Sequence, residues 1–107
     1  MLEVKELNGY QIASLADTDR LTATIATEIK SELTNQLDGN TNLVINLSNI
    51  KFIDSTGIGV LISALKTARQ NNGSFKLCEI QKDVMSLLTL MKLDKVFDII
   101  ESEADIK

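Results

Sequence analysis

The sequence predicts a single α/β domain with a mixed β-sheet, in which an opening hairpin is followed by alternating strands and helices packed on the sheet. Three observations support this. Short apolar runs typical of strands alternate with longer stretches whose apolar residues recur at helical spacing. An Asn-Gly pair near the start is the favoured sequence for a two-residue hairpin turn. No linker, repeat or low-complexity tract divides the 107 residues, so one domain is expected over residues 1–107.

Two segments of alternating apolar and polar side chains form the expected hairpin. They cover residues 2–7 and 10–15, and they flank the turn Asn8-Gly9. Alternation of this kind is typical of half-buried strands, because successive side chains of a strand point to opposite faces. We therefore expect the first two strands to be antiparallel neighbours.

The first helix is expected over residues 21–37, where leucine or isoleucine recurs every fourth residue. Asp17, Thr18 and Asp19 precede it and supply side chains of the kind that cap helix starts. The pair Gly39-Asn40 is a good stop signal. The sequence thus predicts a capped helix with one apolar face.

A strand, a polar hinge and a second helix are expected next. Residues 43–47 form a nearly continuous apolar run, which is typical of a central strand covered on both faces. After a bend, Phe52 and Ile53 are expected to return to the core. The second helix is predicted over residues 58–70, where the apolar side chains have helical spacing.

The remaining residues continue the alternation. A strand is predicted over residues 75–80, a helix over 84–91, another strand over 96–100, and the start of a terminal helix in the acidic segment 101–105. Because strands and helices alternate after the hairpin, we expect parallel neighbouring strands joined by right-handed crossovers.

The composition argues against several classes of function. Fifteen acidic and eleven basic residues give a formal charge of −4 with no Lys/Arg cluster, so no nucleic-acid partner is expected. The chain has no histidine, which removes the commonest general base, the commonest metal ligand and every Ser-His or Cys-His nucleophile pair. We therefore expect neither an enzyme nor a bound cofactor or metal.

The sequence also indicates where the protein resides. It contains no apolar run long enough to cross a bilayer and no export signal, so we expect a cytoplasmic protein without direct membrane insertion. Cys78 is the single cysteine, which fits a reducing compartment. Its place in an apolar strand predicts a buried and unreactive thiol.

The hinge Asp54-Ser55-Thr56-Gly57 holds the candidate functional residues, and two interpretations of Ser55 stay open. In one, Ser55 or Asp54 is simply the N-cap of the second helix. In the other, Ser55 accepts a phosphate, whose charge of about −1.5 to −2 is tolerated at a helix start but repels a docking partner. A catalytic serine is not supported, because no histidine is present to activate it.

Two glycines follow the serine, in the sequence Ser-Thr-Gly-Ile-Gly. This is not a phosphate-binding loop, since it has neither the lysine of a P-loop nor the three-glycine spacing of dinucleotide sites. We expect Gly57 and Gly59 to allow close backbone approach where helix and strand meet.

Residues 46–73, with the sequence NLSNIKFIDSTGIGVLISALKTARQNNG, resemble the STAS domain, and within it the bacterial anti-sigma-factor antagonists. They are similar to the family's strand, its Asp-Ser-[Ser/Thr]-Gly turn and the helix that follows. The segments 93–97 and 101–103 are similar to the family's usual C-terminal part. The resemblance covers nearly the whole chain and implies a single STAS-like domain.

The resemblance implies a function. In this family the serine after the aspartate, here Ser55, is phosphorylated by a serine kinase that is also an anti-sigma factor. The unphosphorylated form binds the kinase, which then releases its sigma factor, and a metal-dependent serine phosphatase reverses the modification. Asp17 matches the position of a family acid close to the phosphoacceptor. The partner-binding residues implied in this way are Asp17, Asp54, Ser55, Thr56, Gly57 and Ile58.

Three places in the chain depart from the family pattern, and one alternative function stays open. Residues 14–16 replace a frequent Gly-Glu-apolar sequence, Thr56 replaces a frequent serine, and Lys92 stands where glycine is usual. STAS-like domains also serve as subunits of lipid-transport complexes or as parts of anion transporters. If this chain has such a role, phosphorylation of Ser55 would be irrelevant.

Overall fold

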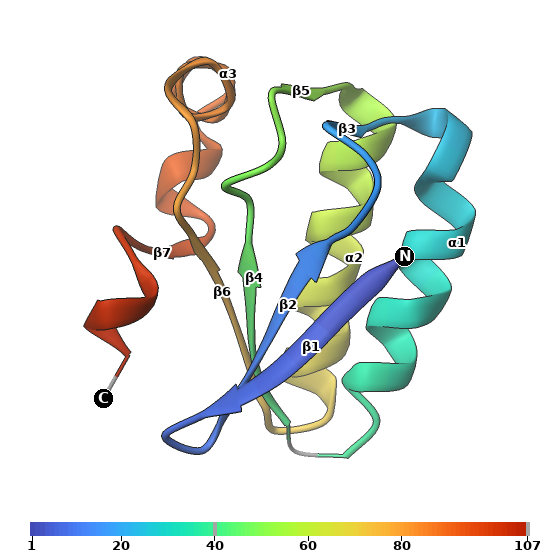
Figure 1. Ribbon diagram of the computed structural model, residues 1–107, viewed down its shortest axis with the longest axis vertical. Helices are drawn as coiled ribbons and strands as arrows, with labels where there is room; N and C mark the ends of the chain where they lie inside the picture. The colour runs from blue at the N-terminus through green and yellow to red at the C-terminus, as the bar shows by residue number, and fades with distance from the viewer. Residues whose placement is uncertain (40, 107) are drawn as a thin grey trace.

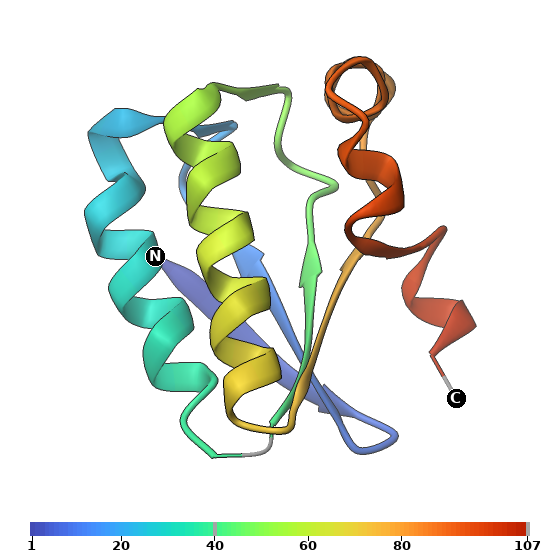
Figure 2. The same ribbon diagram turned by 180° about the vertical axis from the view of Figure 1, so that it is seen from behind.

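The chain folds into a sheet with two long helices on one face and a third helix across one end (Figure 1). The computed structural model describes residues 1–39 and 41–106. Figure 2 shows α1 and α2 lying side by side over the sheet. In chain order the elements are β1 (Leu2–Leu7), β2 (Tyr10–Leu15), β3 (Arg20–Leu21), α1 (Ala23–Gln36), β4 (Asn42–Asn46), β5 (Phe52–Ile53), α2 (Ser55–Gln70), β6 (Ser74–Cys78), α3 (Lys82–Leu90), η1 (Leu93–Lys95), β7 (Asp98–Ile100) and η2 (Glu103–Asp105).

The main sheet is mixed, which confirms the predicted fold class. Its strand order is β1-β2-β4-β6-β7, and only β1 is antiparallel to its neighbour among these strands. Asn8 and Gly9 both have positive φ, 51° and 84°, as a type I′ hairpin turn requires. The two-residue strands β3 and β5 form a separate parallel pair.

The larger apolar core lies between the sheet and helices α1 and α2. Along the central strands the residues that face the helices are buried, as are most of the apolar residues on the helix faces that pack against the sheet. Covering a sheet face in this way removes most of its apolar surface from water, which is the main driving force for folding. The central members of this core are Ala13, Leu15, Ile29, Leu33, Leu43, Ile45, Leu61 and Leu77.

The opposite face of the sheet carries a smaller apolar cluster that the C-terminal segment covers. Ile12, Val44 and Cys78 lie on three adjacent strands, and Ile106 packs against them. Cys78 is buried, which confirms the predicted burial of its side chain. Both faces of the central strands are therefore covered, as the continuous apolar run at residues 43–47 predicted.

A buried polar group anchors the C-terminal segment. Asn46 is 8% exposed, and its Nδ2 donates to Glu79 Oε2 at 3.2 Å and to Glu103 Oε2 at 2.6 Å. Lys5 Nζ lies 2.7 Å from Glu103 Oε1. The hydrogen bond from Lys5, followed by that from Asn46, lowers the pKa of Glu103. The terminal helix expected in residues 101–105 is only the short turn η2.

The first helix begins later than expected. Arg20 and Leu21 form β3 and pair with Phe52 and Ile53 of β5, so α1 begins at Ala23. Leu21 is fully buried and contributes to the core from a strand.

The helix ends within one residue of the predicted end. Its C-cap is Leu37, and Gly39 follows with a φ of 83°. The second half of the Gly39-Asn40 signal, Asn40, lies outside the described residues.

Phe52, which was expected in the core, and two apolar residues at the ends of predicted elements are exposed. Phe52 is 49% exposed whereas Ile53 is 3% exposed. Consecutive side chains of a strand point to opposite sides, so only one of this pair can face the core. Met91 and Val96 are also exposed, because α3 ends at Leu90 and β7 begins only at Asp98.

Lys92 keeps the backbone conformation that a glycine would adopt in the same turn. Its φ is 61° and its ψ is 23°, in the left-handed region. Side chains with a Cβ are disfavoured there, so the turn is retained at some cost in free energy.

Cys78 is expected to be unreactive in the native protein. Burial, followed by the nearby charges of Glu79 and Glu103, raises the pKa of its thiol to about 12. Since the thiolate is the reactive form, labelling by a thiol reagent at pH 8 should be more than about 100-fold slower in the native state than in denaturant. Equal labelling rates, measured by mass spectrometry, would contradict the burial of this side chain.

Candidate functional site

The hinge between β5 and α2 lies at the end of the domain where β2, β4 and β6 have their carboxyl ends (Figure 1). In open sheets with parallel strands, this end is where binding residues gather. The β3–β5 pair brings two loops together there. The Asp19 carbonyl accepts hydrogen bonds from the Lys51 N–H at 2.8 Å and the Phe52 N–H at 3.3 Å. The segment before α1 is therefore tied to the segment before α2.

Asp54 caps both helices at once. It is the N-cap residue of α2, and its Oδ1 accepts a hydrogen bond from the Gly57 N–H at 2.8 Å. Its Oδ2 accepts a second bond, from the Ala23 N–H of α1 at 3.1 Å. The N-cap residue of α1, Thr22, makes no side-chain capping bond of its own. One carboxylate thus satisfies N–H groups at two helix starts, which would otherwise lack partners within their helices.

These bonds favour the charged form of the carboxyl group. The backbone hydrogen bond from Gly57, together with that from Ala23, holds the pKa of Asp54 below its ordinary value of 3.8. The positive ends of two helix dipoles favour a negative charge in the same place. Asp54 is therefore an anion at any pH near neutrality.

Gly57 is required by close packing, as the sequence predicted. A Cβ on Gly57 would lie 2.1 Å from the Leu21 carbonyl oxygen and 2.9 Å from Ile53 Cγ1. The Leu21 carbonyl also accepts a bond from the Asp54 N–H at 3.3 Å. The start of α2 thus rests directly on the backbone of β3.

Gly59 is different, and the expectation for it was wrong. A Cβ on Gly59 would meet no atom within 4 Å, and the residue is exposed. It lies in a groove of about 320 Å³ between α1 and α2. Lys30 is the positively charged residue that lines this groove. The spacing of two glycines in the sequence could not distinguish the packed position from the open one.

Ser55 and Thr56 form the exposed first turn of α2. Since Asp54 is the cap, Ser55 is the first residue inside the helix, and its hydroxyl is not needed to satisfy the helix start. Gly57 and Ile58 are buried beneath this turn. Of the residues expected to bind a partner, Ser55 and Thr56 are therefore accessible, whereas Gly57 and Ile58 support them from below.

Asp17 is exposed and lies in the turn between β2 and β3, with a φ of 62°. The expectation that Asp17 or Asp19 caps the first helix was wrong, because the capping carboxylate comes from Asp54. The path through β3 places the turn with Asp17 at the same end of the domain as Ser55 (Figure 1).

The sequence did not identify one exposed pair at this end. The Arg20 guanidinium carbon lies 5.7 Å from the centre of the Phe52 ring, a cation–π geometry. The two residues are register partners on β3 and β5. The sequence contained one indication of this exposed pair. Phe52 and Ile53 are adjacent in a strand, so their side chains must point to opposite sides and one of them must face outward.

This end of the domain presents an exposed residue with a hydroxyl group. Ser55 is an exposed alcohol on a helix start that is fixed by packing and by the Asp54 cap. In residues 1–39 and 41–106, no group of three or more His, Cys, Asp or Glu side chains is arranged to hold a metal ion. Within the same residues, the longest helices lack the apolar length that spanning a membrane requires.

Comparison with known protein families identifies the family to which the chain belongs. The family model described as the STAS domain matches residues 12–106. The chain belongs to the STAS domain family. The match begins in β2 and ends in the C-terminal segment, so it includes the hinge with Asp54 and Ser55.

Two curated relatives of this STAS domain have informative names. An anti-sigma F factor antagonist of Paenibacillus polymyxa is 31% identical over 64 residues, which are 60% of this chain and 55% of the relative. The chain thus spans about half the length of that relative. An anti-sigma-B factor antagonist of Bacillus subtilis is 27% identical over 92 residues, which are 86% of this chain and 82% of the relative.

A solved structure has the same fold. An anti-sigma-factor antagonist (STAS) domain protein from Planctomyces limnophilus matches with a TM-score of 0.88, covering 97% of this chain and 92% of that one. The two sequences are 21% identical, so this likeness establishes the fold alone.

Loss of the Asp54 carboxylate should destabilise both helix starts. Asp54→Ala is expected to lower the melting temperature by about 5 °C or more at pH 7. Since the folded-state pKa of Asp54 is lowered, its contribution is present above 3.8 and is lost as the pH falls through the folded-state value. The difference in unfolding free energy between the wild type and Asp54→Asn should therefore shrink below pH 3.8. A pH-independent difference in urea titrations would contradict this role.

The two glycines of α2 should respond oppositely to the same substitution. Gly57→Ala forces a Cβ against the Leu21 backbone and should destabilise the protein by about 2 kcal/mol. Gly59→Ala meets open space, and alanine favours a helix over glycine by about 1 kcal/mol, so it should stabilise the protein. Chemical denaturation of both variants checks the pair. A loss of stability in Gly59→Ala would show that its surroundings are not open.

Proposed function

We propose that this chain is an anti-sigma-factor antagonist that acts in the cytoplasm as a phosphorylation-gated binding switch. In the unphosphorylated form it binds an anti-sigma factor with serine kinase activity, and the sigma factor is then released. Phosphorylation of Ser55 ends the interaction, and a metal-dependent serine phosphatase restores it. The observation that carries this proposal is the exposed Ser55 hydroxyl directly after the capping Asp54, in a chain of the STAS family.

The geometry of the hinge supports phosphoryl transfer to Ser55. Its hydroxyl is accessible at the first turn of α2, while Gly57 and Ile58 beneath it are packed against the core. A kinase can therefore reach the acceptor without unfolding the helix start. A rigid acceptor also lowers the cost of aligning the hydroxyl with the transferred phosphoryl group.

The same geometry supports gating by charge. A phosphate on Ser55 would lie at a helix start, where a negative charge is tolerated, so the fold should survive the modification. The adjacent Asp54 is already an anion held by two helices. The modified surface would then present concentrated negative charge, and a partner fitted to the neutral hydroxyl would meet repulsion and an unpaired buried charge.

We include Asp17 in the partner surface as well. It is an exposed acid on the turn that leads into β3, at the same end of the domain as the hinge. Because Asp17 does not cap α1, its carboxylate is available for a partner.

The test is phosphorylation by candidate anti-sigma kinases of the source organism. We expect incubation with kinase and ATP to add one phosphoryl group, located on Ser55 by peptide mapping. Ser55→Ala should abolish the modification while retaining kinase binding. Ser55→Asp should weaken kinase binding by at least about tenfold, because it adds a fixed charge at the interface.

The neighbouring hydroxyl and the exposed acid provide controls. Thr56→Ala should still be phosphorylated on Ser55. Asp17→Asn, whose side chain also tolerates a left-handed backbone, should slow phosphorylation without lowering the melting temperature. If no kinase modifies Ser55, or if Ser55→Ala and Ser55→Asp bind a kinase equally well, the switch is excluded. The role of an unphosphorylated subunit in a transport complex would then be favoured.

A further inference from the structure

We propose that the outer edge of β1 pairs with the same edge of a second copy of this chain, as antiparallel strands with Val4 on the two-fold axis. The resulting dimer would have one continuous sheet across both subunits. This surface differs from the Ser55 hinge, and the proposal does not depend on the switch function.

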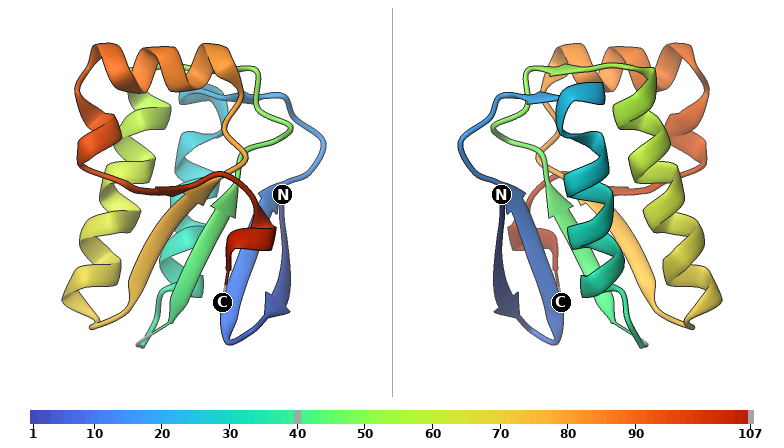
Figure 3. Two further views of the ribbon diagram at one scale, coloured as in Figure 1. Left: turned by 90° about the vertical axis from the view of Figure 1, so that its left-hand side faces the viewer. Right: turned by 90° about the vertical axis from the view of Figure 1, so that its right-hand side faces the viewer.

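The outer side of β1 is an open sheet edge. β1 is the first strand in the order β1-β2-β4-β6-β7, and among residues 1–39 and 41–106 it pairs only with β2. Both views of Figure 3 show it at one outer edge of the sheet. An edge strand of six residues presents backbone groups that another strand can pair with.

The hairpin determines which residues present those groups. The two-residue turn makes Leu7 and Tyr10 a hydrogen-bonded pair, so Lys5 and Glu3 also direct their backbone groups toward β2. The bond from the Ala16 N–H to the Met1 carbonyl, at 2.8 Å, continues this alternation.

The remaining residues of β1 direct their backbone groups outward. Leu2, Val4 and Glu6 alternate with those that bond to β2. The Leu2 N–H donates to Glu32 Oε1 at 3.2 Å, which leaves the Leu2 carbonyl and both groups of Val4 and Glu6 for a partner strand. In a symmetric contact, the hydrogen-bonded pairs between the two strands must therefore be formed by Leu2, Val4 and Glu6.

Charge selects one register among those that remain. With Val4 opposite the partner's Val4, Glu3 lies opposite the partner's Lys5, and the symmetry repeats this pair. Sliding one strand by two residues in one direction places Glu3 opposite the partner's Glu3. Sliding it by two residues in the other direction places Lys5 opposite the partner's Lys5. Opposite charges stabilise cross-strand pairs and like charges destabilise them. The β1 sequence is therefore complementary to itself in the Val4-centred register only.

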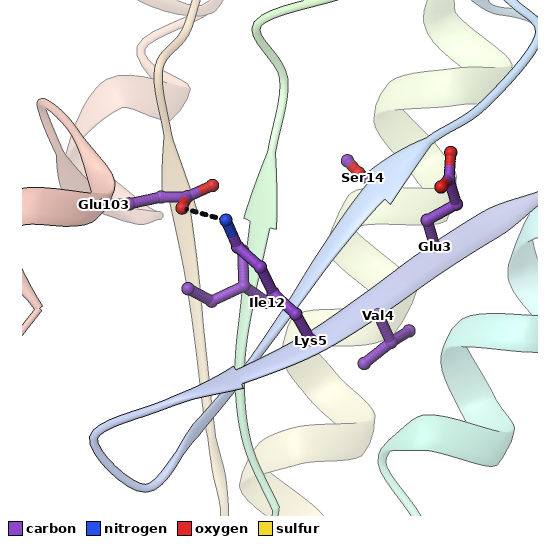
Figure 4. Close-up of a pocket in the computed structure, with 6 residues that line it drawn as sticks. All are labelled: Glu3, Val4, Lys5, Ile12, Ser14 and Glu103. Carbon is purple, nitrogen blue, oxygen red and sulfur yellow. Dashed lines mark ion pairs between the residues drawn. The ribbon is translucent and has the colours of Figure 1, made fainter.

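The side chains are directed as this register requires. Figure 4 shows the hollow beside this edge, with Glu3 and Lys5 extending from one face of β1 and Val4 from the other. The Lys5 side chain remains 64% exposed although its Nζ contacts Glu103, so it can also approach a carboxylate from a second copy. Val4 is 38% exposed, and two Val4 side chains would cover one another across the axis.

The dimer should be weak and sensitive to salt. Pairing of one short edge buries less surface than a permanent dimer requires. Charged side chains on edge strands commonly prevent such pairing, and here they oppose every register except one. Because the two ion pairs are exposed, added salt should weaken the association.

The test is sedimentation velocity on the full chain at low salt, from about 10 µM to about 1 mM. We expect a reversible monomer–dimer equilibrium whose dissociation constant rises with added NaCl. Glu3→Lys should raise the dissociation constant by about tenfold or more, because it places like charges opposite one another. Val4→Pro should abolish the dimer, because it removes the outward N–H while the β1–β2 bonds remain. The matched control Val4→Thr should still dimerise.

A charge exchange provides an independent arm. Lys5→Glu should also fail to self-associate, but an equimolar mixture of Glu3→Lys and Lys5→Glu should form a heterodimer with both opposite-charge pairs restored. Far-UV circular dichroism and melting curves check that each variant is folded, since Lys5→Glu also removes the contact with Glu103. A wild-type protein that is monomeric at about 1 mM would overturn the proposal. A dimer unchanged by both Glu3→Lys and Val4→Pro would also overturn it.

Discussion

The carboxylate of Asp54 accepts one hydrogen bond from the start of α2 and one from the start of α1, thirty-one residues earlier in the chain. Because both bonds involve one small rigid group, the two helix starts are fixed relative to each other. The β3–β5 pair and the contact of Gly57 with the Leu21 backbone support the same junction. These contacts join segments that are distant in the sequence, and together they position the residues around Ser55.

This arrangement separates stability from recognition at the end of the domain. The groups that hold the junction together, Asp54 and Gly57, are half-buried or buried, while Ser55 and Thr56 are exposed. Modification of an exposed hydroxyl can therefore change the surface without removing a structural contact. A switch built in this way would alter affinity through charge and would leave the fold in place.

Much of the fold followed from patterns within short segments. Alternation and the Asn8-Gly9 turn predicted the hairpin, and apolar spacing predicted the three helices with errors confined to their ends. The errors arose where distant contacts competed with local signals. Residues 17–19 have the composition of a helix cap, but pairing with β5 extends the chain through Leu21, and the cap comes from Asp54. Phe52 is apolar, yet the outward side of a two-residue strand leaves it exposed.

The sequence by itself determined the fold class, the family resemblance, the buried Cys78 and the exclusion of histidine-based chemistry, because these depend on composition or on patterns within a few residues. The tertiary structure decided which hinge residue is the cap, which glycine is packed and which residues around Ser55 are accessible. It also decided that Glu3 and Lys5 share an open edge with Val4 between them. Each of these depends on which distant segment lies alongside, and local spacing contains no such information.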